Sequence, residues 1–502
     1  MNSPQSEPGS LHRFWQTAAT LLLALGMSHF AAKAGILTLG PDYRKPTNSV
    51  PSAYKAAEFT GTWKEGKPLD GVPRGNWWRV FGDEALNRLE ERAEQSNPRF
   101  EAALARVEQS RATARIANGA LLPSLSVDPN LSRQGYSPNK VPTFGTLTAN
   151  TFSTPLDLSY EVDLWGRVRR GFESARDEAQ ASVAAMNAVL LTLHADVAEN
   201  YFTLRALDAE IHTVVDSVTL RREQVRLVRL REQDGLGNAL EIAQAETELA
   251  NAEAESAVLA KHRDELENAI AILVGTHPSS FRLAPLAISD WRVLPPEIPA
   301  GLPAELLERR PDVSEAERQL AAANAKVGIA KAAFFPVLTL TGSGGFLSAD
   351  VDTLFNWNSR AWSIGPSLSV PLFAGGRNRA NFHRAQAAYE QSVAQYRERV
   401  LVAFGEVESG LSGIRHLSER SNAQARAVAS SRDAADLADD RYRSGASSYL
   451  EVVDANRQAL DTERAGQQLN GQRLVATVQL IKALGGGWNE RELFAGVNRG
   501  GP

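Results

Sequence analysis

No cysteine occurs among the 502 residues of the chain, and this absence excludes disulfide bonds, thiol nucleophiles, thiolate metal sites, iron–sulfur clusters and cysteine-linked lipid anchors. A charge excess of one sign is missing as well, because 54 basic and 59 acidic residues leave a formal net charge of −5. Strong global attraction to nucleic acid or to anionic lipid is therefore not expected. Beyond the N-terminus, no apolar run reaches the roughly 20 residues that a membrane-spanning helix needs. If this chain crosses a membrane, it does not do so as a helix bundle.

Composition and length indicate a folded protein. Hydrophobic residues make up 43% and charged residues 23%, so the chain can bury a core, and its length allows about three or four domains. Residues 1–34 have the order of an export signal, with His12 and Arg13 before the apolar stretch Thr17–Met27 and the A-x-A pattern Ala32-Lys33-Ala34. A short buried helix is the alternative. We expect a signal peptide and a mature chain outside the cytoplasm, where the lack of cysteine suits the oxidising environment.

The sequence contains an internal repeat. A shift of 213 residues places Asn97–Val127 over Arg310–Leu340, and a shift of 210 places Gly166-Arg167 over Gly376-Arg377. The match continues to Gly275 and slips by only a few residues where loops change length. Solenoid units have periods of about 20–50 residues. A repeat of this length therefore indicates a duplicated half-molecule.

Each half contains two segments in which apolar and polar residues alternate strictly. Leu125, Val127 and Leu131 alternate with serine, aspartate and asparagine, and the pattern recurs from Asp157 to Leu164. A period of two is typical of strands with one apolar and one polar face. Loops rich in glycine, proline, serine and asparagine separate the segments of each pair. We therefore predict two β-hairpins, and four strands in all, at about residues 124–164 and 337–373.

The other segments have the spacing of long helices. From Phe172 to about Gln233 the chain contains neither proline nor glycine, and its apolar residues recur at steps of three, four and seven. This narrow stripe is typical of a coiled-coil seam, and about 60 residues give a helix of roughly 90 Å. We expect a matching helix in the second half, and tip turns at about 234–240 and 443–448 that lead into return helices ending near Gly275 and Gly485. Shorter helices are expected at 83–121 and 302–335.

Four strands cannot close a barrel, and an open two-faced sheet exposes edges that aggregate. Hairpins with an apolar outer face fit an outer-membrane barrel, and three chains would supply twelve strands. A water-soluble β-sandwich is the alternative, in which the apolar faces of two sheets pack together. Hairpins that lie between long coiled coils in the sequence leave no second sheet for such packing. With the apolar residues facing lipid, four acidic residues would line the lumen: Asp128, Asp157, Glu161 and Asp163.

No catalytic, cofactor or metal site is expected. The eight histidines lack metal-ligand spacing, and His194 lies on the apolar stripe where the second half has Phe404, so we expect a packed histidine. Gly342-Ser343-Gly344-Gly345 lacks the lysine of a phosphate-binding loop. Asp350 and Asp352 begin a calcium-like spacing that does not continue. The sequence therefore does not predict an enzyme.

A series of short motifs follows in a specific order and spacing along nearly the whole mature chain. The motifs are Gly40-Pro41-Asp42-Tyr43, Trp77-Trp78, Phe81-Gly82-Asp83, Asn97-Pro98, Ala105-Arg106-Val107, Arg310-Pro311-Asp312-Val313, Pro371-Leu372-Phe373-Ala374-Gly375-Gly376 and Leu484-Gly485-Gly486-Gly487-Trp488. With these motifs the chain resembles the TolC-type outer-membrane efflux channel family, in particular its NodT-type branch, the outer-membrane factors of tripartite efflux systems. A lipid-bearing cysteine, frequent in that branch ahead of the first motif, is absent here.

The resemblance implies an α+β membrane protein in which a homotrimeric barrel continues into a long antiparallel α-helical tunnel through the outer membrane and periplasm. It implies export of drugs or other small solutes received from an inner-membrane pump, expected to be proton-driven, through a periplasmic adaptor. The exit channel of a type I protein secretion system and a purely structural envelope coiled coil are the alternatives. The implied parts are a signal peptide (1–34), an extended segment packing near the equatorial region (35–82), a first repeat (83–299), a second repeat (300–488) and a tail (489–502).

The resemblance also nominates site residues. In that family, acidic residues at the matching positions narrow the closed periplasmic entrance of the tunnel. The resemblance therefore points to Glu451 and Asp454 in this chain. Ser448 with Glu451 is also a capping-box pattern, which Asn238 and Glu241 repeat, so Glu451 is as well explained as a helix cap. The copy of Asp454 is Gln244, so the repeated helix start does not require its charge; an ordinary solvated charge is the alternative. The adaptor would contact the tips at Gly235, Leu236, Gly237, Gly445, Ala446 and Ser447.

Overall fold

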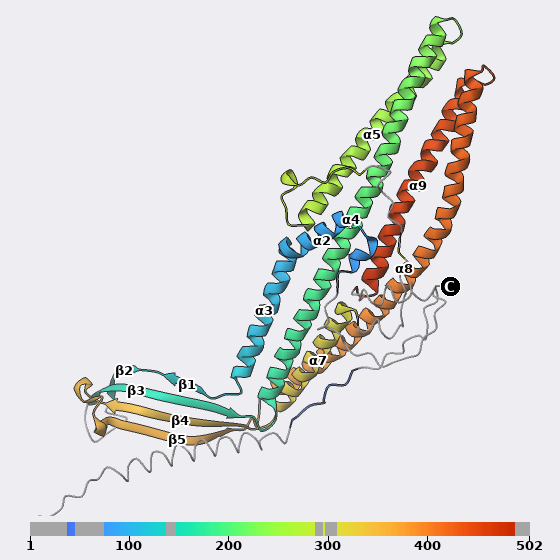
Figure 1. Cartoon of the computed structure of the whole chain (residues 1–502). Coiled ribbons are helices and arrows are strands. Elements are labelled where there is room, and N and C mark those ends of the chain that lie inside the picture. The colour runs from blue at the N-terminus through green and yellow to red at the C-terminus, as the bar shows by residue number, and fades with distance from the viewer. Residues whose placement is uncertain (1–37, 46–74, 137–146, 287–294, 297–308, 487–502) are drawn as a thin grey trace, which may run out of the picture. The chain divides into compact units, whose positions relative to one another are not determined.

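The computed structural model describes residues 38–45, 75–136, 147–286, 295–296 and 309–486 (Figure 1). The predicted signal peptide and C-terminal tail lie outside these residues. The chain divides into two compact units. We call Met1–Pro46, Glu108–Ala181 and Glu317–Gln395 the sheet unit, and Thr47–Val107, Ser182–Ala316 and Tyr396–Pro502 the helical unit.

The sheet unit contains one antiparallel sheet. Its strands are β1 (Ser124–Val127), β2 (Asn130–Tyr136), β3 (Leu147–Val162), β4 (Val337–Ser348) and β5 (Arg360–Ser369). The order is β1-β3-β4-β5, and β2 also pairs with β3 (Figure 1). The four predicted strands are thus five segments in four sheet positions, because β1 and β2 follow each other along β3 in one register. Pro129, which has no N–H to donate, lies in the interruption between them.

The two faces of this sheet differ in polarity, as the alternation predicts. One row across the strands reads Ser126, Asp157, Ser343 and Ser363, and the next row reads Leu125, Leu158, Gly342 and Ile364. The apolar row is open to the surface of the chain, where Ile364 is 72% exposed. This unit therefore presents an uncovered apolar face of the kind that needs lipid or a partner.

The predicted helix at 83–121 is two helices, α2 (Glu84–Ser96) and α3 (Pro98–Gly119). The break falls at Asn97, whose backbone is extended, as the residue before a proline prefers. Its side-chain oxygen accepts the backbone N–H of Arg99 at 2.8 Å, and its amide donates to the carbonyl of Leu273 at 2.8 Å. Asn97 therefore caps α3 and ties this corner to the end of another helix.

The long helices form two hairpins. Helices α4 (Arg167–Gln233) and α8 (Arg377–Arg443) have 67 residues each, about 100 Å at 1.5 Å per residue. They return as α5 (Ala239–Leu273) and α9 (Tyr449–Ala483), with 35 residues each (Figure 1). Gly235 and Gly445 take φ values of 73° and 76° in the turns, a conformation that favours glycine. Helix α7 (Pro311–Ala332) precedes β4.

The core of the helical unit is aromatic. A short 3₁₀ helix, η1 (Trp77–Phe81), packs with α2 against residues of α4, and Trp78 and Phe202 are almost completely buried. Among the described helices, α4 has an 18-residue window of mean hydropathy 1.4, long and apolar enough to cross a membrane by length and composition alone. Buried core helices pass the same test, so this one helix is weak evidence for a span.

Candidate functional site

The predicted tip residues lie in the two turns that join α4 to α5 and α8 to α9. Leu236 is 72% exposed at the first turn. Glu451 and Asp454 lie in the first two turns of α9, and both are exposed. The structure therefore places all these residues at the ends of the helical hairpins. The predicted tip residues are Gly235, Leu236, Gly237, Gly445, Ala446 and Ser447.

An apolar cluster just behind the turns joins the two hairpins. The rings of Tyr442 of α8 and Tyr449 of α9 pack at a tilt, with centroids 5.4 Å apart. Around them the cluster buries side chains from all four long helices, so burial of apolar surface favours keeping the hairpins together. Its buried members are Val225, Val228, Ala245, Tyr442, Tyr449, Val452 and Val453.

Tyr442 also links the hairpins through polar contacts. Its hydroxyl donates to a carboxylate oxygen of Glu241 at 3.0 Å. Arg231 of α4 donates to the backbone carbonyl of Tyr442 at 3.2 Å, and its guanidinium lies 4.5 Å from the centroid of the tyrosine ring. Burial and the Glu241 carboxylate raise the pKa of Tyr442 to about 12, so its hydroxyl keeps its proton near neutral pH.

A buried carboxylate forms a second link between the hairpins. Glu248 of α5 is 5% exposed. It accepts a hydrogen bond from Arg457 Nε of α9 at 3.0 Å, while Arg221 of α4 donates to its carboxylate and, at 3.2 Å, to its carbonyl. Burial acts to raise the pKa of Glu248, but the hydrogen bonds from Arg457 and Arg221 outweigh it and the pKa is lowered. Glu248 is therefore ionised and held by two cations.

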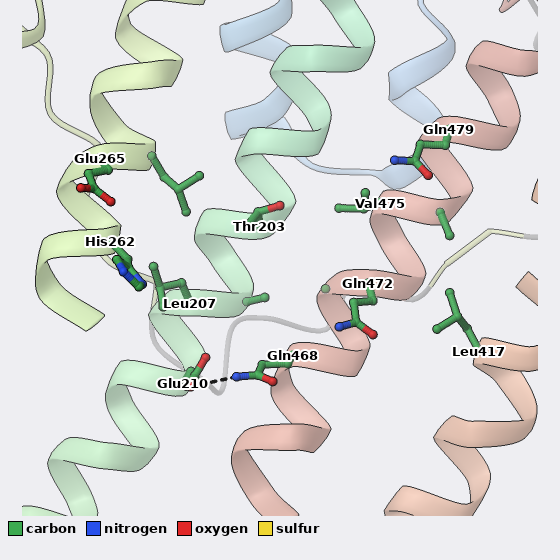
Figure 2. Close-up of a pocket in the computed structure, with 14 residues that line it drawn as sticks. Thr203, Leu207, Glu210, His262, Glu265, Leu417, Gln468, Gln472, Val475 and Gln479 are labelled. Atoms are coloured by element: carbon green, nitrogen blue, oxygen red, sulfur yellow. Dashed lines mark hydrogen bonds between the residues drawn. The ribbon is translucent and has the colours of Figure 1, made fainter. Parts of the chain in front are cut away.

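A third link borders a groove across the helices (Figure 2). Arg464 Nε of α9 donates to Glu210 of α4 at 2.9 Å, and Gln468 donates to the same oxygen at 3.1 Å. The groove has a volume of about 880 Å³ and is lined by α4, α5, α8 and α9. His262 and Glu265 line it on α5, yet within the described residues no group of three or more acidic or histidine side chains could hold a metal ion.

The capping expectation is right for one tip and wrong for the other. The side chain of Asn238 accepts the N–H of Glu241 at 3.0 Å and donates to its carboxylate at 3.2 Å. Ser448 makes no such bond, and its backbone carbonyl accepts the N–H of Glu451 instead. The Glu451 carboxylate lies 3.8 Å from Arg441. The structure thus removes the capping explanation for Glu451.

Asp454 has no direct cationic partner among the described residues. Arg443 pairs with Asp439 at 2.6 Å, and Arg457 is bound to Glu248. Both arginines therefore have other carboxylate partners, and Arg457 interacts with Asp454 only through its charge.

The four acidic residues predicted to line the lumen differ in whether an arginine pairs with their carboxylate. Asp157 and Glu161 lie on the polar face of the sheet, Asp128 lies in the interruption between β1 and β2, and Asp163 follows the end of β3. Glu161 is paired with Arg167, and Asp163 accepts bonds from the backbone N–H and Nε of Arg169 at 2.8 and 3.2 Å. Among the described residues, Asp128 accepts only a hydroxyl, from Ser126 at 3.0 Å. Both arginines come from the start of α4 and not from a strand, so the alternating pattern of the strands gave no sign of them.

A buried acid–base pair was also missed. Nδ1 of His194 lies 2.7 Å from Oε2 of Glu90, which is completely buried. Trp78 covers the imidazole at 4.3 Å between centroids. Burial lowers the pKa of His194 to about 4 and raises that of Glu90 well above its ordinary value. The packed histidine is confirmed, and its partner makes the pair neutral with one shared proton.

Comparison with known proteins agrees with this arrangement. The family model for outer membrane efflux proteins matches residues 89–276 and 302–486. The solvent efflux pump outer membrane protein SrpC of Pseudomonas putida is 33% identical over 460 residues, which cover 91% of this chain and 96% of that protein. The pyoverdine export outer membrane protein OpmQ of Pseudomonas aeruginosa is 36% identical over 421 residues, 82% of this chain and 87% of that protein.

A solved structure of the outer-membrane channel OprN superimposes with a TM-score of 0.81 at 30% identity, covering 90% of this chain and 99% of that one. Long helical hairpins joined to a two-faced sheet thus define a TolC-like channel protein. The chain belongs to the outer membrane efflux protein family. It is an efflux channel component of the outer membrane, with its helical part in the periplasm.

Proposed function

We propose that this protein is the outer-membrane channel of a tripartite efflux system. It receives small solutes from an inner-membrane pump through a periplasmic adaptor and releases them outside the cell, without catalysing a reaction. The observation that carries the proposal is the full-length similarity to efflux proteins, joined to a sheet that has an uncovered apolar face and two open edges.

The open edges support a trimer. Strands β1 and β2 form one edge of the sheet and β5 forms the other. Unpaired backbone groups cannot face hydrocarbon, so a sheet in a membrane closes into a barrel. Three copies with four sheet positions each give twelve, an even number within the range of outer-membrane barrels.

The proposed parts follow the chain. A signal peptide (1–34) and an N-terminal segment (35–82) precede two repeats (83–299 and 300–488) and a tail (489–502). Matching lengths of 67 and 35 residues for the paired helices support the duplication. The hairpin turns are the adaptor contacts, since they are the exposed ends of the hairpins.

Another component of the efflux system selects the exported substrate. One of the two relatives is named for solvent efflux and the other for pyoverdine export. Similar channel chains are thus named for different substrates, which supports selection by the pump.

Purified protein tests the proposal. We expect a trimer whose electrophoretic migration changes on heating, and ion conductance after insertion into planar bilayers. A trimer that inserts without conducting, or a monomer, would contradict the proposal.

Asp454→Ala is expected to raise the resting conductance and to weaken block by divalent or trivalent cations added from the periplasmic side. Three Asp454 carboxylates near one axis repel each other, so the closed entrance binds cations. Asp461→Ala is the matched control, an exposed aspartate two turns further along the same helix. If Asp454→Ala leaves conductance and block unchanged, the constriction lies elsewhere.

The open channel is expected to prefer cations modestly, and more strongly at low salt. Because Glu161 and Asp163 are paired with arginines, the field comes mainly from Asp128 and Asp157. Reversal potentials under a salt gradient should move toward zero in Asp128→Asn/Asp157→Asn and less in Glu161→Gln. Anion preference of the wild type would refute the lumen assignment.

A further inference from the structure

Charges of opposite sign lie on opposite faces of the sheet. Asp157 and Glu161 are on the polar face. Arg133 of β2 is in register with Asn150 and lies two positions beyond Leu131, and Arg360 is in register with Phe346. Both arginines are therefore on the apolar face. Within the strands that the structure describes, they are the only charged residues on that face.

Both arginines lie toward the same end of the sheet. Arg360 is the first residue of β5, directly after the connection 349–359, and Arg133 is three residues from the end of β2. The long helices enter and leave at the opposite ends of the strands, because α3 leads into β1, β3 into α4, α7 into β4 and β5 into α8. Since the helical part is periplasmic, the arginines belong at the outer leaflet of the outer membrane.

The surroundings of Arg360 are typical of a membrane interface. Its guanidinium lies over the ring of Trp357, and Nε donates to the Trp357 carbonyl at 2.6 Å. Trp357 and Trp362 are 68% and 79% exposed, and outer-membrane barrels carry such aromatic girdles at both interfaces. Neither arginine forms an ion pair with any residue that the structure describes, although Asp350 and Asp352 lie in the neighbouring connection.

We propose that Arg133 and Arg360 bind the phosphate groups of lipid A, the phosphorylated lipid of the outer leaflet. An arginine at the end of a lipid-facing strand extends its charge to the headgroup level, and its planar guanidinium matches a phosphate with two parallel hydrogen bonds. The inference rests on the proposed barrel. Closing it places β5 of one copy beside β1 and β2 of the next, so the two arginines flank each seam between copies and lipid A bridges the subunits.

Native mass spectrometry of the trimer tests this with lipid A that carries both phosphates. We expect Arg133→Gln/Arg360→Gln to weaken lipid A binding roughly 10- to 30-fold. Each of the two arginines near an anionic membrane surface adds a similar favourable free energy of binding, and the double variant loses both. Arg133→Lys/Arg360→Lys keeps both charges but loses the paired hydrogen bonds of the guanidinium, so it should restore only part of the affinity. Arg384→Gln, which changes an exposed arginine on α8, should leave it unchanged.

Two further arms need no variant. Wild-type protein should bind dephosphorylated lipid A more weakly, and inorganic phosphate at millimolar concentration should not displace lipid A. Equal affinity for both lipids, or an unchanged affinity in a conducting Arg133→Gln/Arg360→Gln trimer, would overturn this inference and leave the channel intact. Failure of the wild type to form a trimer would overturn the barrel and this inference together.

Discussion

Glu248→Ala is expected to open the resting channel and to destabilise the helical unit. The substitution leaves Arg221, which is 6% exposed, without its carboxylate, and breaking a buried pair costs about 3–5 kcal/mol of folding free energy. It also removes the bond from Arg457 that ties α9 to α5. A hydrogen bond to a charged group contributes about 1.5–3 kcal/mol, which corresponds to a roughly 10- to 150-fold shift toward the open state. Single-channel recording and thermal unfolding in detergent measure the two effects.

Glu253→Ala provides a matched control on the same helix. Glu253 pairs with Arg222 of α4 at 2.7 Å, so this pair lies within one hairpin, and both side chains are about half exposed. Exposed pairs contribute little, and the link between hairpins stays intact. Conductance and stability should therefore stay near wild type. Equal opening by Glu253→Ala, or no opening by Glu248→Ala, would show that the Glu248 link does not hold the tips closed.

The repeating elements were predictable from the sequence because their patterns are local. Alternation over eight or more residues identified β3 and β4, and the absence of proline and glycine identified α4 to within five residues at its start. Turn chemistry located both tips. The break at Asn97 was also present in the sequence as an X-Pro signal, but the continuing helical pattern on either side obscured it.

The buried charges could not be assigned from the sequence. Glu248 falls between Ala245 and Ala252 on the buried stripe of α5. Its partner Arg457 is 209 residues away, and no local pattern connects residues at that separation. The available signal was a charged residue on the apolar stripe of a helix, because burying a charge without a partner is energetically unfavourable. Naming the partner required the packing of the two hairpins.

Glu90 shows the same limit within the core. It lies between Leu89 and Ala93 on the buried face of α2, where a charged residue is costly. The sequence placed His194 on an apolar stripe but gave no reason to bring these two residues together, since they are 104 positions apart. Their contact forms only when α2 packs on α4.

The Glu90–His194 pair predicts an unusual pH profile. Folded, the pair holds one proton, because Glu90 has a raised pKa and His194 has a pKa of about 4. Unfolded, it holds two protons below about pH 4.5, one up to about 6.5 and none above. Stability rises with pH wherever the unfolded state holds more protons. The contribution of this pair is therefore level between about pH 4.5 and 6.5 and falls above 6.5 by about 1.4 kcal/mol per pH unit until Glu90 ionises.

Glu90→Gln should reverse the direction of this dependence. The alkaline fall disappears because no carboxyl remains to ionise. His194 stays buried and neutral down to about pH 4, while the unfolded chain takes up a proton below about 6.5, so stability now falls on acidification by about 3 kcal/mol in total. Melting temperatures of the wild type and of Glu90→Gln, measured from pH 4 to 9, would show this reversal. Glu94→Gln is the control, since Glu94 lies 3.9 Å from Nε2 of His194 with its side chain 47% exposed, and it should keep the wild-type profile. An alkaline fall that persists in Glu90→Gln would show that it arises from groups other than this pair.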